Sequence, residues 1–353
     1  MQVIQIFSRL LLKNSSPKTT MYITRRVIRF LKFSVALTLL LFLPNCSSIY
    51  TAKIPHQSAD IPEKYFLKEF PFYKQEQYHC GPAALHMVYL WQKKKVNYQQ
   101  IIADTFNTKL KGSLQRSLVE NIRKNGMIPY TIDNYQQLTT EIAAGNPVIV
   151  LQNLGLELIP RWHYAVVIGY DSVNGTVTLH SGAQKNHVVG WKVFSRTWIR
   201  AHNWGMVAVP VTAIPASVNL SLAYKQEYLN EIYGFSRNGH FNLSLTAYNT
   251  ALKKWPDNQT AIIGKADSLY NLKKIDEAID TLKKAIENHS GSAVIYNNLA
   301  HILMEKAGND KMQLQQAHTY AQKALALGNK KQDKNCPAYK QTLQEIKKRL
   351  RIK

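Results

Sequence analysis

The second of the three cysteines in this chain of 353 residues lies in the stretch QYHCGPAALHMVYL. Gly81-Pro82 and the apolar residues after it predict a helix that begins at or just after Cys80, because proline is tolerated in the first turn. Leu85 and Val88 would lie on one face of that helix. Unpaired N–H groups and the positive end of the helix dipole favour a thiolate there, and the thiolate is the nucleophilic form of cysteine. Cys80 is therefore a candidate nucleophile.

A histidine that could serve this cysteine opens a predicted strand further along the chain. His163 precedes the β-branched and apolar run 164–168. Residues 147–151 form an apolar run before it, and Asn174-Gly175 predicts a hairpin that returns as TVTLH. A cysteine at the start of a helix and a histidine on a facing strand is one arrangement that supports nucleophilic acyl transfer.

The stretches QEQYHCGPAAL and HYAVVIGYD resemble the cysteine peptidase domain of the bacteriocin-processing, double-glycine-leader type. They are most similar to the lipoprotein branch that carries tetratricopeptide repeats behind that domain, and the resemblance covers residues 61–212. It implies an α+β papain-like cysteine peptidase domain. It also implies that Cys80 is the nucleophile, that His163 is the general base, and that Gln75 donates to the oxyanion.

The third residue of the resembled site differs here. The family usually places an aspartate-proline after the next strand to orient the histidine, and this chain has His180-Ser181-Gly182, with Ser181 in the aspartate position. A serine can orient an imidazole by hydrogen bonding, but it stabilises an imidazolium less than a carboxylate does. Asp171 follows His163 by eight residues of one strand, about 26 Å, so we expect it to be a turn residue.

Other interpretations of these residues stay open. A lone cysteine is commonly a small buried apolar residue, and a lone histidine on a strand is commonly structural. Trp162 and Tyr164 flank His163 and would either line a substrate groove or pack within the sheet. We expect His79 and His86 to be surface or packing residues.

We expect neither a metal nor a cofactor. A zinc site is conceivable from four residues, but their spacing matches no familiar ligand pattern; they are Cys80, His163, His180 and His187. We assign no role to Cys336, which lies in a predicted loop before the last helix.

The N-terminal residues 1–46 are typical of an export signal. The apolar run FSVALTLLLFL, residues 33–43, follows several basic residues and is too short to span a bilayer comfortably. The sequence LPNCSS after it resembles a bacterial lipoprotein signal, in which Cys46 is acylated and becomes the mature N-terminus. Alternatives are an uncleaved anchor or ordinary secretion, and Met21 would give a more typical signal start than Met1. We therefore expect an exported lipoprotein on the periplasmic face of the inner or outer membrane.

The last third of the chain contains a repeat. Ser244 and Ala278, like Tyr248 and Leu282, are separated by one period of about 34 residues, and a third copy follows after an insertion of five. This period predicts an all-α tetratricopeptide-repeat solenoid, and three copies suffice to bury a continuous core. We expect a tether at 47–60, a linker at 213–222 and the repeats at 223–353. The solenoid would bind a protein substrate or partner, or only stabilise the first domain.

The net charge of +23 comes from 45 basic and 22 acidic residues. Such a balance favours anionic partners, but the sequence has no arginine-rich arm and no nucleic-acid motif, so we expect a solvated basic surface and no nucleic acid. A basic module that binds anionic polymers is the weakest alternative.

Together these features predict an exported, lipid-anchored cysteine peptidase that hydrolyses peptide bonds. The alternative is a catalytically silent scaffold that binds peptides or proteins in a periplasmic complex, which the serine at position 181 favours.

Overall fold

The structure, a computed structural model, describes residues 61–351. The predicted signal at 1–46, its Cys46 and the tether at 47–60 lie outside these residues. All of the described residues belong to one compact unit. None of the helices in this part of the chain is long and apolar enough to cross a membrane.

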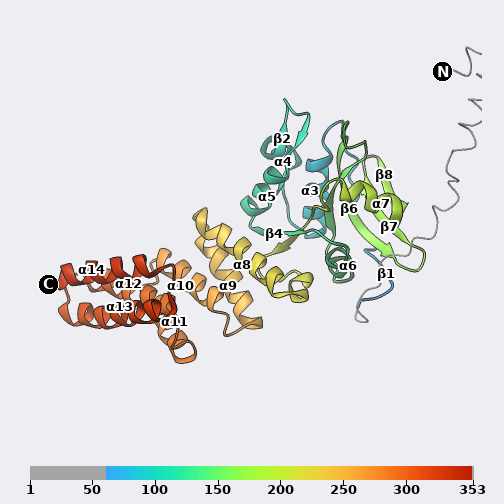
Figure 1. Cartoon of the computed structure of the whole chain (residues 1–353). Helices are drawn as coiled ribbons and strands as arrows, with labels where there is room; N and C mark the ends of the chain where they lie inside the picture. Colours follow the sequence, from blue (N-terminus) through green and yellow to red (C-terminus); the bar gives the residue numbers. More distant parts are fainter. Residues whose placement is uncertain (1–60, 352–353) are drawn as a thin grey trace, which may run out of the picture. The chain divides into compact units, whose positions relative to one another are not determined.

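The described chain begins with an α+β domain (Figure 1). Its helices are α3 (Cys80–Trp91), α4 (Tyr98–Thr105), α5 (Gln115–Lys124), α6 (Tyr135–Ala143) and α7 (Trp191–Ile199). Its strands are β1 (Lys64–Phe66), β2 (Phe106–Asn107), β3 (Gly112–Ser113), β4 (Met127–Ile132), β5 (Val148–Asn153), β6 (Trp162–Asp171), β7 (Thr176–Ser181), β8 (Gln184–Gly190) and β9 (Gly205–Pro210).

The large sheet is antiparallel throughout, in the order β4-β9-β5-β6-β7-β8, and β1 pairs with part of β6. Residues 164–170 of β6 are all buried, so both faces of this central strand are covered. The predicted hairpin at Asn174-Gly175 joins β6 to β7, with Asp171 opposite Thr176. Asp171 Oδ1 accepts a hydrogen bond from the backbone N–H of Asn174 at 2.8 Å, which confirms that Asp171 is a turn residue.

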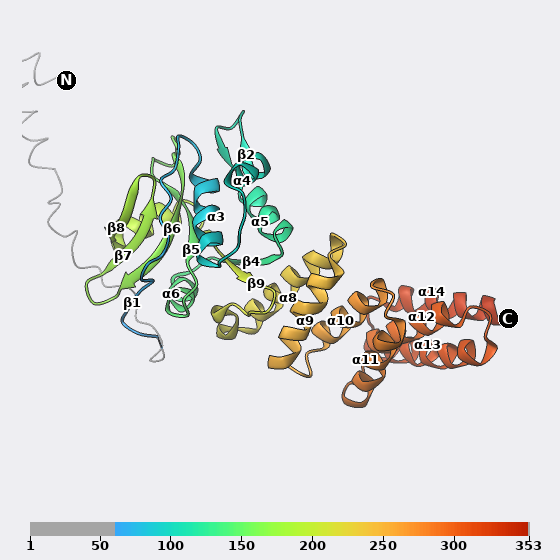
Figure 2. The same cartoon turned by 180° about the vertical axis from the view of Figure 1, so that it is seen from behind.

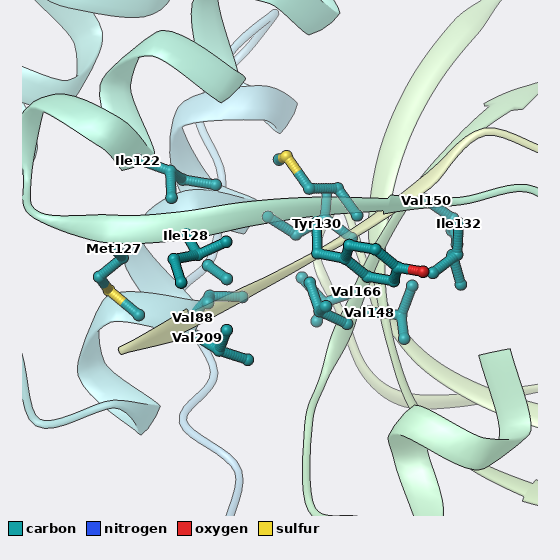
Figure 3. Close-up of a cluster of buried hydrophobic side chains, with 14 of the residues drawn as sticks. Val88, Ile122, Met127, Ile128, Tyr130, Ile132, Val148, Val150, Val166 and Val209 are labelled. Carbon is teal, nitrogen blue, oxygen red and sulfur yellow. The ribbon is translucent and has the colours of Figure 1, made fainter. Parts of the chain in front are cut away.

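The core of the domain lies between α3, α5 and the strands β4, β5, β6 and β9. Figure 3 shows Val88 from α3 and Ile122 from α5 facing Ile128 of β4, with Val209 of β9 beside them. The predicted apolar face of the first helix is confirmed, because Leu85 and Val88 are buried. Packing of this face against the sheet fixes the position of the start of α3, where Cys80 lies.

The chain leaves the domain through a short buried segment, the 3-10 helix η2 (Ala216–Leu220). The carboxylate of Glu141 on α6, which is fully buried, accepts hydrogen bonds from the backbone N–H and hydroxyl of Ser217 at 2.8 and 2.6 Å. It also accepts from Asn146 Nδ2 at 2.7 Å. These bonds compensate for burial of the carboxylate and hold η2 against α6.

The rest of the described chain is all-helical, as predicted. Its seven described helices are α8 (Leu222–Arg237), α9 (Phe241–Lys254), α10 (Gln259–Asn271), α11 (Ile275–Asn288), α12 (Ala293–Ala307), α13 (Lys311–Lys331) and α14 (Cys336–Leu350) (Figure 2). Assignment of these helices to the tetratricopeptide family stays a prediction.

The repeat period is visible in the helix boundaries. α9 begins and ends one period of about 34 residues before α11, and α10 begins one period before α12. The N-cap residues of α10 and α12, Asn258 and Ser292, are separated by the same period. The side chain of each accepts a hydrogen bond from a backbone N–H in the first turn of its helix. The small residues Ser244 and Ala278, at equivalent positions on α9 and α11, are both fully buried. Small side chains at these positions let neighbouring helices approach closely.

Candidate active site

Cys80 is the first residue of α3, as the sequence predicts. Gly81 and Pro82 follow in the first turn, and all three residues precede the buried apolar face. A Cβ added at Gly81 would lie 2.8 Å from both Cβ and Oγ of Ser113, on β3. The absence of a side chain at Gly81 therefore allows the hairpin β2–β3 to approach the start of the helix next to Cys80.

His163 and Ser181 meet across the sheet. His163 is the second residue of β6 and Ser181 is the last residue of β7. Their side chains form a hydrogen bond of 2.8 Å between His163 Nε2 and Ser181 Oγ. Ser181 thus occupies a position from which it orients the imidazole, and Nδ1 is the ring nitrogen that remains for a proton from a thiol.

One cavity of about 720 Å³ brings the predicted site residues together. Gln75, Cys80 and His163 all line it. The other wall is formed by the hairpin β2–β3 and the residues just after it, at positions 110–115. Two cationic side chains, Lys111 and Arg161, line the cavity, and no aspartate or glutamate of the described residues does.

Burial controls the protonation of the two central residues. It raises the pKa of the Cys80 thiol above its ordinary value, although backbone hydrogen bonds from Tyr164, Gly81 and Cys80 itself act in the opposite direction. Burial also lowers the pKa of His163 to about 4. The backbone N–H groups at the helix start thus lower the pKa of Cys80, as predicted, but burial raises it by more. At neutral pH the pair consists of a thiol and a neutral imidazole.

Some residues of the site were not predicted from the sequence. Ser113 Oγ is buried in the cavity wall and has no hydrogen-bond partner among the described residues. The hydroxyl of Tyr164 donates to the backbone carbonyl of Ser113 at 3.2 Å, which ties β3 to β6. The hairpin that carries Ser113 has strands of only two residues, so no alternation of apolar and polar residues marks it in the sequence.

Of the other histidines, His202 also lines the cavity, whereas His180 packs elsewhere in the domain. His180 is buried between the rings of Phe70 and Phe72, its Nδ1 accepts from the backbone N–H of Asn186, and its Nε2 lies 3.4 Å from the carbonyl of Phe70. Among the described residues there is no cluster of three or more side chains that could hold a metal ion.

Two more histidines make aromatic contacts, in agreement with the predicted packing roles. The His86 ring lies 4.8 Å from that of Tyr73, and the His79 ring lies 4.8 Å from that of Phe106. Trp162 and Tyr164 combine the two expected roles, because both line the cavity while the Tyr164 ring also packs against Trp204.

The order of elements, the antiparallel sheet and the cysteine at the helix start agree with a known peptidase family. Residues 67–206 match the model of the Peptidase_C39 like family. This C39-like domain has an α+β fold of cysteine peptidase type, and it contains Gln75, Cys80, His163 and Ser181. The matched segment ends before the helical region.

Solved structures are similar to parts of this chain. A C39-like peptidase from Bacillus anthracis is 17% identical with a TM-score of 0.36, and the match covers 42% of this chain and 98% of that one. A double-glycine-motif protease from an AMS/PCAT transporter, in complex with its leader peptide, is 20% identical with a TM-score of 0.33, covering 41% and 94%. MamA from Desulfovibrio magneticus RS-1 is 16% identical with a TM-score of 0.22, covering 45% and 93%. No curated protein matches the chain in sequence.

Proposed function

We propose that this protein is a cysteine peptidase whose C39-like domain hydrolyses peptide bonds. The observation that carries the proposal is that Cys80 and His163 line one cavity, with Ser181 hydrogen-bonded to Nε2 of the imidazole. A nucleophile, a base and a group that orients the base are the elements of acyl transfer by cysteine.

In the first half of the reaction Cys80 Sγ attacks the carbonyl carbon of the scissile peptide, and His163 Nδ1 takes the thiol proton. The side-chain amide of Gln75 and the backbone N–H of Cys80 donate to the oxyanion. The tetrahedral intermediate collapses as the C–N bond breaks, and His163 gives the proton to the leaving amine. A thioester on Cys80 remains.

In the second half water attacks the thioester, and His163 again takes the proton. The C–S bond breaks, the acid product leaves, and the proton returns to the Cys80 sulfur. Because burial keeps the thiol and the imidazole neutral at rest, the proton moves during the attack. His163 therefore acts as a general base and not as one half of a preformed ion pair.

The same residues also support a second candidate, a domain that binds peptides without cleaving them. Ser181 supplies no negative charge to stabilise the imidazolium that forms when His163 takes a proton. The raised pKa of Cys80 keeps its sulfur in the less nucleophilic form. In this alternative the cavity holds a peptide and the helical region organises a complex.

We further propose that the protein is exported and anchored through a lipid on Cys46, and that its helices α8–α14 are tetratricopeptide repeats that recruit a protein substrate or partner. The signal-like sequence before Cys46 supports the first part. The repeat period in the boundaries of α9 to α12 supports the second.

The test is the rate at which iodoacetamide alkylates Cys80 at pH 7 in the full chain, with His163→Ala as the comparison and mass spectrometry of the labelled peptides as the readout. If His163 is the base, we expect the Cys80 rate to fall by about 100-fold in the variant. Cys336, which is partly buried far along the chain, serves as the internal reference and should not change.

A Cys80 rate that is indifferent to His163 would contradict the peptidase proposal and favour the binding domain. If the rate instead falls in His163→Ala, cleavage of a synthetic peptide library by the wild type, lost in Cys80→Ala and kept in Cys336→Ser, would identify the substrate sequence.

A further inference from the structure

The loop between β5 and β6 displays large apolar side chains to solvent. This loop, residues 154–161 with the sequence LGLELIPR, is called the β5–β6 loop below. Leu156, Leu158 and Ile159 are 67%, 95% and 71% exposed. Isolated exposed leucines are ordinary on protein surfaces, but a contiguous apolar group on one loop marks an interaction site.

The backbone of the β5–β6 loop is held in one shape by Asn153, the last residue of β5. Asn153 Oδ1 accepts from the N–H groups of Gly155 and Arg161, each at 2.9 Å. The loop is closed by a backbone bond of 2.9 Å from Leu154 N–H to the Arg161 carbonyl. Asn153 is itself buried, with 2% exposure. The structure therefore positions the apolar side chains outward, and their exposure does not result from an unfolded loop.

The exposed aliphatic side chains of the loop lie outside the cavity. Of the residues from Leu154 to Trp162, only Arg161 and Trp162 line the space that contains Cys80 and His163. A peptide seated in the cavity would thus contact the base of the loop and leave Leu158 and Ile159 uncovered. Their occupant must be a separate apolar surface.

Basic and apolar side chains continue on the opposite wall of the same cavity. The hairpin β2–β3 extends beyond the N-terminal end of α3 in both views (Figures 1 and 2). It exposes Leu110 at 60%, between Lys109 and Lys111. Residues 106–113 include no acidic side chain, and the β5–β6 loop includes one, Glu157. The mouth of the cavity therefore combines apolar tips, an exposed tryptophan and an excess of cations.

We propose that the β5–β6 loop inserts into the surface of a lipid bilayer with anionic headgroups. Exposed aliphatic side chains on the loop, tryptophan at its base and lysine or arginine beside it match the layers of such a surface: acyl chains, interface and headgroups. A second protein chain would have to supply an apolar pocket for the tip, and the charges beside it complement anionic lipid without one.

The length of the preceding chain is compatible with this placement. Ile61, where the described structure begins, follows Cys46 by fifteen positions, and a chain of this length reaches about 50 Å at most. A lipid on Cys46 would therefore keep the domain within reach of the same membrane. The consequence is that the cavity with Cys80 opens at the bilayer surface, whether or not that cysteine is reactive.

The experiment uses the full chain reconstituted with vesicles of anionic phosphatidylglycerol whose acyl chains carry bromine, a short-range quencher of tryptophan fluorescence. The chain has six tryptophans and none within residues 1–60, so the expected N-terminal anchor contributes no signal. The difference in quenching between the wild type and Trp162→Phe isolates Trp162, which is 54% exposed.

We expect Trp162 to be quenched by brominated anionic vesicles and the quenching to disappear when Leu156, Leu158 and Ile159 are all replaced by serine. The matched control is Leu222→Ser, which removes an 80% exposed leucine from the start of α8 and should leave the quenching intact. Because all four side chains are exposed, the variants should keep the wild-type melting temperature.

Three results would overturn the inference. One is equal quenching of wild type and Trp162→Phe, which places the loop in water. Another is unchanged quenching in the triple variant, which assigns insertion to other residues. The third is equal quenching with zwitterionic vesicles, which removes the role of the cations.

Discussion

Ser181 holds His163 through a hydrogen bond between neutral groups, and this bond distinguishes the present site from one with a carboxylate. The imidazole is buried, and its pKa of about 4 reflects that burial alone. A carboxylate beside Nε2 would favour the charged imidazole and offset part of the burial. The identity of residue 181 should therefore control both the pKa of His163 and the rate of the reaction.

We predict that Ser181→Asp raises the pKa of His163 above about 4 and increases peptide cleavage. The measurement is a proton NMR titration of the His163 ring combined with turnover of a library peptide. Ser181→Asn is the matched control, because it adds a side chain of similar size without charge. An Asp variant with the same pKa as the Asn variant would show that residue 181 does not act on His163 through charge.

We also predict that His163 makes the folded protein sensitive to acid. Its pKa is about 4 in the folded state and about 6.5 when unfolded, so the unfolded chain binds the proton more tightly. The contribution of His163 to the free energy of unfolding is fully present above pH 6.5 and is lost as the pH falls toward 4. The full difference between the two pKa values corresponds to a loss on the order of 3 kcal/mol. Urea unfolding across this range should show a smaller decline in His163→Gln than in the wild type.

The start of α3 and the hairpin β2–β3 form one structural element of the site. The hairpin lies against Gly81, and Tyr164 on β6 anchors its Ser113. Cys80 is thereby fixed from two sides, by the apolar face of α3 and by the hairpin. Neither the helix nor the hairpin alone would form the cavity wall.

We predict that Gly81→Ala disturbs this element. The new methyl group would lie 2.8 Å from Ser113 Cβ, a contact that real side chains essentially never show, so the hairpin must move. Overpacking of this kind costs about 1–3 kcal/mol, and displacement of the wall should lower cleavage more than it lowers stability. Gly112→Ala is the control, because a methyl group there meets nothing closer than 3.9 Å. Equal effects of both variants on cleavage would refute this account.

At the scale of the whole molecule, the core of the C39-like domain continues into the first helices of the helical region. Tyr228, Leu229, Ile232 and Phe235 of α8 belong to the same buried cluster as the strands of the sheet. Arg123 of α5 and Glu231 of α8 form a partly buried ion pair beside them. α8 therefore packs as part of the core that supports the sheet.

We predict that Ile232→Ala destabilises the C39-like domain although the substitution lies in the helical region. Ile232 is fully buried, and such a truncation costs about 2–5 kcal/mol. Hydrogen exchange of β4 should become faster. Ile346→Ala is the matched control: Ile346 is equally buried but belongs to the second cluster, formed by α10 to α14, so β4 should not respond. Unchanged exchange of β4 in Ile232→Ala would show that the two regions unfold independently.

Much of the site and the fold was predictable from local patterns. Glycine-proline after Cys80 predicts a helix start, because proline fixes the backbone for a first turn. The run after His163 and the Asn174-Gly175 turn predict β6 and β7, since both signals depend on a few neighbouring residues. The repeat period predicts the spacing of α9 to α12, because each repeat is one helical pair with the same local sequence pattern.

The sequence by itself determined the candidate site residues, Gln75, Cys80 and His163, and predicted the helix and the strand that hold Cys80 and His163. Only the tertiary structure decided their electrostatics. Burial depends on what packs over a residue from distant parts of the chain, so the raised pKa of Cys80 and the lowered pKa of His163 have no local signal. The same holds for Ser113, for the outward side chains of the β5–β6 loop and for the core shared with α8, because each results from contacts between segments that are far apart in sequence.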